Sequence, residues 1–478
     1  FEALNNAGHL RKDLIVVLND NKLSISKSVG ALSRYLNRIM VNPLYNKTRR
    51  RLQILIKRLP VFGFKAFKAA KRLEESMKGL LVPGAFFEEL GFRYFGPING
   101  HNINELITTF KNLSTLKEPI IVHVITKKGK GYRFAEEKPS VFHGTPAFKV
   151  EAGEAIDKKE APAFTQVFSD KIVKLARNDQ RIVTITAAMP DGTGLARFSQ
   201  EFPNRFYDVG IAESHAVGFS AGLARGGLKP VVAIYSTFLQ RGYDQIIHDI
   251  SLQNLAVVFC VDRAGLVGED GPTHHGVFDI AYLRHVPNLT VMAPRDGVEF
   301  EKMLEFAMKL NKPVAIRYPR GSSVSHISAS SLDEIKLGTS ELLREGKDMA
   351  IFAIGSMVPT AIKAADLLSG DGIESAVINA RFVKPLDKEM IEEITRRTKR
   401  IVTLEEGVAA GGFGSAILEF LERENIKNIR VKRIGLPDHF ITHGKRDELL
   451  REYHLTPGEI HDTIKKEFFE SIKWQESR

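Results

Sequence analysis

The sequence has little cysteine and no long apolar segment. Its one cysteine, Cys260, stands within an apparent strand, so a disulfide within the chain is impossible and a cysteine-based structural zinc site is excluded. We therefore expect a reducing, intracellular compartment. No apolar run approaches the roughly 20 residues that span a bilayer, and we expect a protein without membrane contact.

Acidic residues are absent from one long stretch of the chain. Twelve Lys or Arg residues and no Asp or Glu lie between Arg34 and Arg72, which by itself can account for the net charge of +11. We interpret this stretch as part of a mobile, solvated insertion over about residues 28–78. A non-enzymatic alternative is a polyanion-binding module that acts through residues 34–72. Because the stretch holds no recognised binding motif and few interleaved aromatic residues, we expect no nucleic-acid partner.

The sequence also lacks an initial methionine. It opens on Phe1, and residues 1–8 have the pattern of the interior of a helix that ends at Gly8. We expect that a segment ahead of Phe1 has been lost, so the sequence does not bear on a targeting peptide.

Short apolar runs rich in Val and Ile recur with helix-length spacers between them. The runs do not alternate with polar residues, a pattern typical of strands that are covered on both faces. Strands of this kind that alternate with helices indicate parallel sheets. We therefore predict an α/β protein with three parallel-sheet domains. The runs are residues 14–18, 120–125, 182–185, 231–234, 257–261, 314–316, 350–354 and 401–404.

Two stretches lack this alternation of apolar runs and helix-length spacers, and we interpret them as linkers. The first mixes Pro, Gly, Lys and Glu without periodic apolar positions, and the second begins with six Ser in residues 321–331. The first domain is expected to be incomplete. The predicted domains are residues 1–143, 164–320 and 345–478, and the predicted linkers are residues 144–163 and 321–344.

Residues 262–276 carry a dense set of polar side chains. They follow the apolar run 257–261 and combine Arg263, three acids, two adjacent His and four Gly. Loops at the carboxyl ends of strands are where open α/β sheets bind their ligands. Each side chain alone would more often be a turn former or a helix cap, but their combination suits an anionic, proton-exchanging substrate. Arg320 follows another strand, and two Arg at neighbouring strand ends could clamp a phosphate.

Two further strand ends hold candidate site residues. Glu213 stands where a strand turns into a helix rich in small residues. It is either a helix cap or a carboxylate aimed at a ring nitrogen of a bound heterocycle. Tyr235 and Phe238 follow the run 231–234, where aromatic side chains could equally belong to the core. From the residues alone, both interpretations of Glu213 stay open, and so do both interpretations of the two aromatic residues.

Four motifs occur in a fixed order: Ile-Ala-Glu-Ser-His-Ala at 211–216, Tyr-Ser-Thr-Phe-Leu-Gln-Arg at 235–241, the 262–276 loop, and Arg-Tyr-Pro-Arg-Gly at 317–321. Together they resemble the transketolase superfamily of thiamine-diphosphate enzymes and, within it, the 1-deoxy-D-xylulose-5-phosphate synthase family. The resemblance runs from the first domain through the last. It implies three α/β domains of the transketolase type: a truncated cofactor-binding domain, a pyrimidine- and acceptor-binding domain, and a C-terminal domain. A homodimer in the bacterial cytoplasm or plastid stroma is implied as well.

The resemblance implies thiamine diphosphate and Mg²⁺ as cofactors. Glu213 matches the family's glutamate that hydrogen-bonds the aminopyrimidine, and Phe238 matches the ring stacked on it. Residues 19–25 match the second half of the family's metal-diphosphate motif, with the Asn21 side chain and the Leu23 carbonyl as Mg²⁺ ligands. Without the resemblance we would interpret this segment as a turn. Further positions that match cofactor contacts are Tyr132 and Arg241.

The implied reaction joins pyruvate, with loss of CO₂, to D-glyceraldehyde 3-phosphate. The product, 1-deoxy-D-xylulose 5-phosphate, opens non-mevalonate isoprenoid precursor synthesis and supplies thiamine and pyridoxal synthesis. Arg263 and Arg320 match phosphate-binding positions. We expect His274 to exchange protons with the aldehyde oxygen of the acceptor. Asp270 and Tyr235 match other positions around the acceptor, Asp270 with a catalytic role beside Glu213 and His274, and Lys128 and His143 match positions in the active-site region.

The family pattern is incomplete in this sequence. Family members carry a Gly-Asp-Gly motif just ahead of the helix that Phe1 opens, and its Asp binds Mg²⁺. No such motif precedes Asn19 here. Losing an anionic ligand weakens the binding of a cation that demands near-octahedral geometry, so we expect the polypeptide as written to be inactive.

Two enzyme alternatives stay open, a transketolase and the beta subunit of a 2-oxoacid dehydrogenase. Residues 19–25 and the first domain argue against the beta subunit, and the choice of pyruvate or a ketose as donor separates the synthase from transketolase. A further motif, residues 411–415, has the composition of a phosphate-binding loop but lacks the Lys of a P-loop. We interpret it as a tight turn before a helix.

Overall fold

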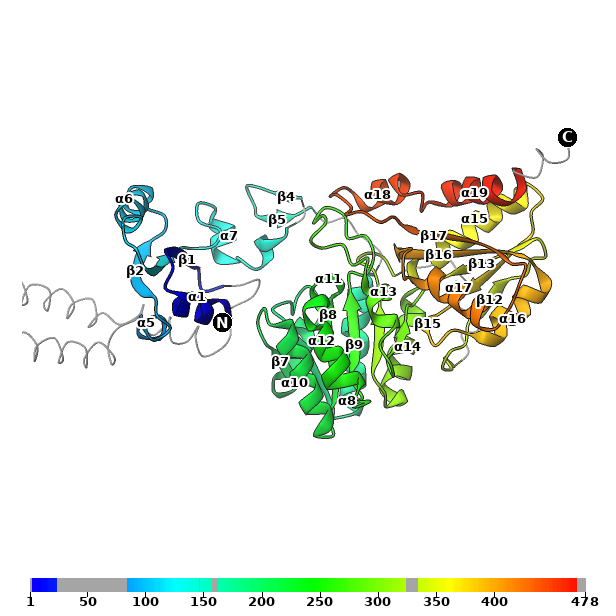
Figure 1. Cartoon of the computed structure of the whole chain (residues 1–478), viewed down its shortest axis with the longest axis horizontal. Helices are drawn as coiled ribbons and strands as arrows, with labels where there is room; N and C mark the ends of the chain where they lie inside the picture. Colours follow the sequence, from blue (N-terminus) through cyan, green and yellow to red (C-terminus); the bar gives the residue numbers. More distant parts are fainter. Residues whose placement is uncertain (1, 24–83, 146, 157–161, 324–333, 471–478) are drawn as a thin grey trace, which may run out of the picture. The chain divides into compact units, whose positions relative to one another are not determined.

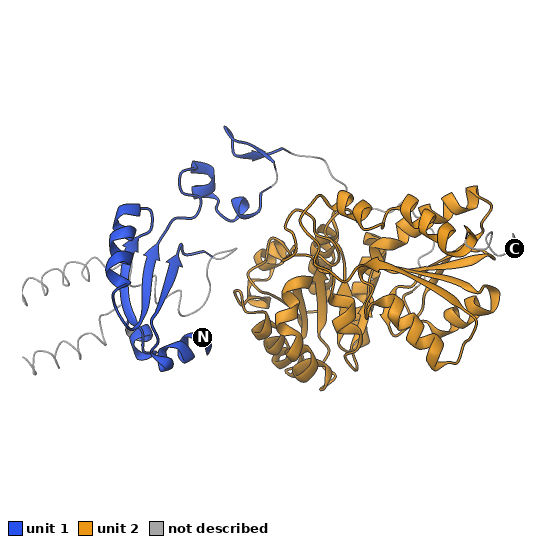
Figure 2. Ribbon diagram, turned by 45° about the horizontal axis from the view of Figure 1, so that its top comes forward, with its two compact units in different colours: residues 1–157 blue, residues 158–478 orange. Residues whose placement is uncertain are grey.

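The computed structural model describes residues 2–23, 84–145, 147–156, 162–323 and 334–470. The chain forms two compact units, residues 1–157 and 158–478, which are described separately here (Figure 2). The predicted basic insertion at about residues 28–78 lies outside the described residues. Among the described helices, none combines the length and the apolar character that a bilayer crossing needs.

The first unit is built on a three-stranded parallel sheet in the order β1-β3-β2. The central strand β3 (Pro119–Ile125) is buried, because apolar side chains cover it on both faces. The edge strand β1 (Leu14–Asp20) is half exposed, so the prediction that this run is covered on both faces is wrong in this structure. The other elements are β2 (Arg93–Asn99), α5 (Ala85–Glu89), α6 (Ile103–Leu113), α7 (Arg133–Glu137), η1 (Val141–His143), β4 (Phe148–Lys149) and β5 (Glu154–Ala155).

Helix α1 (Glu2–Leu10) corrects a second expectation, because it runs through Gly8 instead of ending there. Gly8 is buried, and a Cβ atom at this position would lie 1.7 Å from the carbonyl oxygen of Leu90. The glycine therefore permits close packing of the helix on the chain that enters β2.

The second unit holds two sheets, shown in green and in yellow to red in Figure 1. The larger one has the order β15-β10-β11-β9-β8-β6-β7, and its strands are parallel except β15. Helices α8 (Phe164–Asn178) and α14 (Gly297–Leu310) share one apolar core with alternate residues of the central strands. Its strands are β6 (Ile182–Thr186), β7 (Phe206–Asp208), β8 (Lys229–Tyr235), β9 (Val258–Asp262), β10 (Thr290–Met292), β11 (Val314–Arg317) and β15 (Phe382–Lys384).

Shorter helical segments connect these strands, and α10 (Glu213–Arg225) packs against β8. They are α9 (Ala196–Glu201), η2 (Pro203–Arg205), α11 (Ser236–Leu239), η3 (Gln240–Gly242), α12 (Tyr243–Gln245), η4 (Ile246–Ser251) and α13 (Asp279–Arg284).

The smaller sheet has the order β12-β14-β13-β16-β17, with β12 antiparallel to its neighbour. Each sheet of this unit therefore carries one antiparallel edge strand beside strands that pair in parallel, and the prediction of parallel-sheet α/β domains is confirmed. The strands are β12 (Glu341–Arg344), β13 (Met349–Ala353), β14 (Ser375–Asn379), β16 (Arg400–Val408) and β17 (Arg430–Leu436). The helical segments are η5 (Gly355–Met357), α15 (Val358–Gly370), α16 (Lys388–Arg397), α17 (Phe413–Arg423), α18 (Arg446–Glu452), α19 (Pro457–Lys465) and η6 (Lys466–Glu470).

The predicted apolar runs all fall on strands, and seven of the eight agree with the observed bounds within two residues. The run 401–404 is shorter than its strand β16, which continues to Val408. The predicted linkers are less uniform. The stretch 144–163 includes the two-stranded β4-β5 ribbon, and the stretch 321–344 ends in β12.

Buried ions join the two sheets of the second unit. The Arg381 guanidinium pairs with Glu299 of α14 at 2.7 Å and with Glu341 of β12 at 2.9 Å. Glu341 also pairs with Arg295 at 2.5 Å. Because Arg381 directly precedes β15, the strand that the last domain adds to the larger sheet, this network fixes the junction between the two sheets.

Candidate active site at the carboxyl ends of the larger sheet

Parallel pairing brings four predicted site residues to one edge of the larger sheet. Tyr235 and Asp262 end β8 and β9 as ladder partners. The Arg263 guanidinium lies over the Tyr235 ring, 3.7 Å from its centroid. Arg320 follows β11 and pairs with Asp270 of the 262–276 loop at 3.1 Å. The carboxyl edge of this sheet therefore presents two guanidinium groups around one phenol.

The Tyr235 hydroxyl stays protonated at neutral pH. Burial raises its pKa to about 12, with Arg263 and Arg320 opposing the rise and Asp262 and Asp270 adding to it. A neutral phenol both donates and accepts hydrogen bonds, which suits a position beside an acceptor oxygen.

Phe238 and His274 extend the aromatic wall from Tyr235. The Phe238 ring is stacked on Tyr235 at 5.6 Å, and His274 meets Phe238 edge-on at 5.4 Å. His274 Nδ1 lies 2.9 Å from the Thr273 hydroxyl. Among the residues that the structure describes, His274 Nε2 has no protein partner, so this nitrogen is available to a ligand.

His275 has a different environment. It is buried, its Nδ1 accepts a hydrogen bond from the Val267 amide at 3.1 Å, and its Nε2 lies 3.1 Å from the Thr442 carbonyl. An acceptor role at Nδ1 fixes the neutral tautomer that donates from Nε2. His275 thus supports the loop, whereas its neighbour His274 faces the aromatic wall.

Glu213 lies in the first turn of α10 and is 2% exposed. It makes no hydrogen bond that caps the helix. The structure therefore does not support the interpretation of Glu213 as a helix cap. Its carboxylate pairs with the Arg241 guanidinium at 2.7 Å. Helix α10 packs against α11, which carries Phe238. A buried carboxylate beside an aromatic segment fits a nitrogen heterocycle that donates hydrogen bonds.

In the first unit, Asn21 and Leu23 form a turn at the end of β1. The Asn21 side-chain oxygen accepts a hydrogen bond from the Leu23 amide at 2.9 Å, and Lys22 has a φ of 63°. The interpretation of this segment as a turn therefore agrees with its backbone geometry. Asn21 and Leu23 still offer oxygen donors, the chemistry that Mg²⁺ prefers. Within the described ranges, no cluster of three or more His, Cys, Asp or Glu could hold a metal.

A buried chain of polar groups lies behind this turn, and sequence reasoning missed it. His123 of β3 is fully buried, with Nδ1 2.6 Å from the Tyr94 hydroxyl and Nε2 3.2 Å from the Asp20 carboxylate. The other oxygen of Asp20 accepts the Lys22 amide at 2.9 Å. The run of apolar residues around His123 was the available signal, because a lone His in a buried strand needs partners for both nitrogens.

Lys128 and His143 come together in the first unit, and Tyr132 packs against Phe142, the residue before His143. Lys128 Nζ is 2.8 Å from His143 Nδ1. Burial lowers the pKa of both groups, and the charge of Lys128 lowers that of His143 further. The Tyr132 hydroxyl donates to the Val150 carbonyl at 2.7 Å, and its ring packs against three others. These rings are Phe134, Phe142 and Phe148.

The turn after β6 is a further part of the site that sequence reasoning missed. The Gly192 carbonyl accepts a hydrogen bond from Arg263 at 2.8 Å, and a Cβ at Gly192 would lie 1.8 Å from the Tyr235 hydroxyl oxygen. Glycine is therefore required for the close approach of this turn to Tyr235. Pro190-Asp191-Gly192, a few residues after a predicted strand, was the signal that could have found it.

Residues 411–415 form no phosphate cradle. The Glu405 carboxylate accepts the amides of Phe413 and Gly414 at 2.7 and 2.9 Å, so the amino end of α17 is filled by a side chain of the protein. The interpretation as a turn before a helix agrees with the structure.

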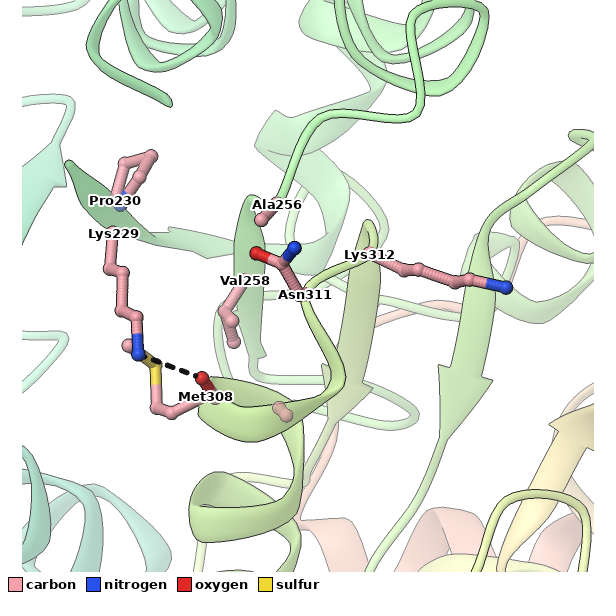
Figure 3. A pocket seen from close by; sticks show the side chains of 8 residues that line it. Lys229, Pro230, Ala256, Val258, Met308, Asn311 and Lys312 are labelled. Carbon is pink, nitrogen blue, oxygen red and sulfur yellow. Dashed lines mark hydrogen bonds between the residues drawn. The ribbon is translucent and has the colours of Figure 1, made fainter. Parts of the chain in front are cut away.

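A small hollow lies at the opposite end of the larger sheet. It is lined by the starts of β8 and β9 and the end of α14, where Lys229 donates to the Met308 carbonyl at 3.2 Å (Figure 3). Its volume of about 10 Å³ has room for little more than one water. It is not a substrate site.

Asp262 makes the stability of the protein depend on pH. Burial raises its pKa to about 6 from an ordinary 3.8, while Arg263, Thr165 and Arg320 oppose the rise. Because the folded pKa is the higher one, the folded state keeps a proton that the unfolded chain has released, so stability falls as pH rises from about 4 to 6 and then levels off. We expect Asp262→Asn to remove this slope, a difference of about 3 kcal/mol at pH 7.

Urea unfolding of both proteins at pH 4.5 to 7.5 checks this prediction. The curves of stability against pH should converge at the acid end and separate toward neutral pH. Parallel curves over the whole range would show that Asp262 does not carry the effect.

Comparisons with known proteins cover nearly the whole chain. Residues 1–126 match the family model described as 1-deoxy-D-xylulose-5-phosphate synthase. Residues 160–324 match the transketolase pyrimidine binding domain, and residues 338–460 match the transketolase C-terminal domain.

Curated relatives and solved structures agree with these matches. The 1-deoxy-D-xylulose-5-phosphate synthase of Heliobacterium modesticaldum is 54% identical over 459 residues, 96% of this chain and 71% of the relative. That of Halothermothrix orenii is 52% identical over 98% of this chain and 73% of the relative. A split-gene transketolase, an inactive beta4 tetramer, is similar with a TM-score of 0.58 at 31% identity, over 64% of this chain and 98% of that one. The transketolase of Campylobacter jejuni shares the fold, with a TM-score of 0.55 at 17% identity over 98% of this chain and 74% of that one.

Proposed function

The chain belongs to the 1-deoxy-D-xylulose-5-phosphate synthase family, and from this premise we propose which of its residues carry the reaction. The reaction condenses pyruvate, with loss of CO₂, with D-glyceraldehyde 3-phosphate to form 1-deoxy-D-xylulose 5-phosphate. The observation that carries this assignment is the identity of 54% over 96% of the chain. Thiamine diphosphate, held with a divalent metal ion, supplies the electron sink for the decarboxylation when it is bound.

Arg263 and Arg320 are proposed to bind the acceptor phosphate. Both flank Tyr235, and guanidinium groups match a phosphate in charge and geometry. Arg320 and Asp270 are about half exposed, and an exposed ion pair of this kind contributes little, roughly 0–1 kcal/mol. The pair can therefore open when a phosphate dianion offers Arg320 a stronger partner.

His274 is proposed to exchange a proton with the aldehyde oxygen of the acceptor, with Tyr235 and Asp270 beside it. Its Nδ1 is held by Thr273, which orients the ring and leaves Nε2 toward a ligand. Imidazole is the side chain best suited to proton exchange near neutral pH.

Cofactor binding is proposed for residues of both units. In the second unit, Glu213 would hold the pyrimidine, Phe238 would stack on it, and Arg241 would keep the Glu213 charge paired. In the first unit, Asn21 and Leu23 would bind Mg²⁺. Tyr132, Lys128 and His143 are proposed to line the cofactor or substrate path.

The choice of donor tests the reaction against its nearest rival. The holoenzyme used in this and the following tests is the chain extended ahead of Phe1 by the family's Gly-Asp-Gly segment and loaded with thiamine diphosphate and Mg²⁺. It should release CO₂ from pyruvate and form 1-deoxy-D-xylulose 5-phosphate when D-glyceraldehyde 3-phosphate is added. Activity with a ketose donor and none with pyruvate would indicate a transketolase instead. The expectation that the 478-residue polypeptide alone makes no product stays a prediction, as do the homodimer and the location in the bacterial cytoplasm or the plastid stroma.

The phosphate role predicts a selective loss of acceptor recognition. We expect Arg320→Gln to raise the KM for D-glyceraldehyde 3-phosphate about 10- to 100-fold, the effect of losing a hydrogen bond to a charged group, with the KM for pyruvate unchanged. Unphosphorylated D-glyceraldehyde is the matched control, because it offers Arg320 no phosphate. An equal effect on both acceptors would refute a phosphate contact.

A further inference from the structure

The 262–276 loop is anchored by the C-terminal domain as well as by the sheet that carries it. Leu266 of the loop is fully buried and belongs to the apolar core of the smaller sheet. Its amide donates to the Glu406 carboxylate at 2.9 Å. A residue of the proposed acceptor loop is therefore fixed by β16, a strand 140 residues further along the chain.

Glu406 is built into this position. It is fully buried, and its other carboxylate oxygen accepts from Ser356 at 2.7 Å and from Arg446 at 2.6 Å. Gly265 makes the approach possible, because it has a φ of 85° and a Cβ there would lie 2.7 Å from the Glu406 carboxylate. Glycine adopts this backbone conformation without strain.

A second set of contacts holds the next part of the loop. His275 bridges the Val267 amide and the Thr442 carbonyl. The Gly268 carbonyl accepts the Gly444 amide at 3.4 Å, and a Cβ at Gly271 would lie 3.2 Å from that of His443. Residues 442–446, which lead into α18, thus run along the loop from Gly268 to Gly271.

The anchored segment lies between the groups proposed to bind the acceptor. Arg263 precedes Leu266, and Asp270 and His274 follow it within the same loop. The amides of Gly265 and Gly276 close the loop on each other's carbonyls at 2.7 and 2.8 Å. A shift of the anchored segment therefore moves Asp270 and His274 relative to the sheet.

We propose that Glu406 is a positioning residue for acceptor recognition, and that it acts with Arg446 through the Leu266 amide. The C-terminal domain thereby has a part in substrate binding as well as in stability. This inference rests on the proposed function of the 262–276 loop. Glu406 touches no reacting atom in this scheme; it sets the place of Asp270 and His274 through the loop backbone.

The test compares Glu406→Gln with Glu405→Gln. A glutamine at 406 can satisfy the Leu266 amide or the Arg446 guanidinium, but its NH₂ group then faces the other donor. Glu405 is the matched control, since it is equally buried, lies next in sequence, and bonds the amides of α17 and not the loop. Arg446→Gln is a milder second variant, because the Arg446 side chain is partly exposed and its loss removes only the partner of Glu406.

Two readouts distinguish positioning from stability. We expect Glu406→Gln and Arg446→Gln to weaken binding of D-glyceraldehyde 3-phosphate about tenfold in calorimetry. Hydrogen exchange in a peptide covering residues 264–276 should become faster in both. Glu405→Gln should lower the melting temperature but leave ligand binding and the hydrogen exchange of the loop unchanged. In the holoenzyme, Glu406→Gln and Arg446→Gln should raise the acceptor KM more than they lower kcat, and Glu405→Gln should not.

The outcomes separate this inference from the function on which it rests. If the unmodified protein binds no D-glyceraldehyde 3-phosphate, the proposed function fails and the inference with it. If it binds this ligand and folded Glu406→Gln and Arg446→Gln bind it equally well, with unchanged exchange of the loop, the inference alone is overturned.

Discussion

Replacing Glu213 by glutamine is expected to lower kcat/KM for pyruvate about 10³-fold, within the range of general acid–base catalysis. Glutamine has nearly the same shape as glutamate, but it can neither carry the negative charge nor take up a proton. The buried position leaves no water to substitute for the carboxylate. Steady-state release of CO₂ by the holoenzyme measures the loss, and calorimetric titration of the protein with thiamine diphosphate and Mg²⁺ measures cofactor affinity independently.

The fold should survive this substitution, because Arg241 is more than half exposed and water can solvate it once its partner is neutral. Glu201→Gln is the matched control, since Glu201 is also paired with an arginine, Arg177, but at the surface. We expect Glu201→Gln to retain the activity of the unmodified protein. Glu213→Gln within threefold of that activity would remove Glu213 from the reaction.

Arg381→Met is expected to cause the largest loss of stability, about 3–5 kcal/mol, as for other buried ion pairs that lose one partner. The substitution leaves the fully buried Glu299 without its strongest cation. Burial already raises the pKa of Glu299, and Arg381 is the largest opposing contribution. In the variant the folded pKa rises further, so the variant keeps the Glu299 proton to a higher pH than the unmodified protein does, and the loss grows with pH once Glu299 of the unmodified protein is ionised.

Scanning calorimetry checks this prediction. Because Arg381 fixes the junction of the two sheets, we expect one unfolding transition in the unmodified protein and two in the variant. Arg397→Met is the control, since Arg397 pairs with Glu345 and Glu393 at the surface and such pairs contribute roughly 0–1 kcal/mol. Equal losses in the two variants would show that the buried network is not what holds the junction.

The parallel architecture could be predicted from sequence because buried parallel strands are continuous apolar runs. Strands without such a run were missed. β7, β10 and β15 have three residues each, too few to form a pattern. β2 is interrupted by Gly96 and Pro97, and β17 is an edge strand in which three charged residues break up the apolar positions.

The candidate site could be predicted where its polar side chains lie close together in the sequence. It could not be predicted where it depends on contacts between segments that are far apart in the sequence. The 262–276 loop and Glu213 could be singled out as candidates from local residues and family resemblance, and their roles stay predictions. The contact of Arg263 with Gly192 spans 71 residues, and that of Leu266 with Glu406 spans 140. Such contacts involve ordinary residue types, a glycine carbonyl and a backbone amide, which carry no local signal.

The antiparallel strand β15 has a consequence for how genes of this kind can recombine. Residues 382–384 follow the point at which the sequence of the last domain begins, yet they complete the sheet of the domain before it. A hybrid that takes its last domain from a distant relative must also supply a strand that pairs with β10 and an arginine that neutralises Glu299. Crossover at the apparent domain boundary would leave β10 as an unpaired edge, which is a site for aggregation. The two domains should therefore be inherited as one module.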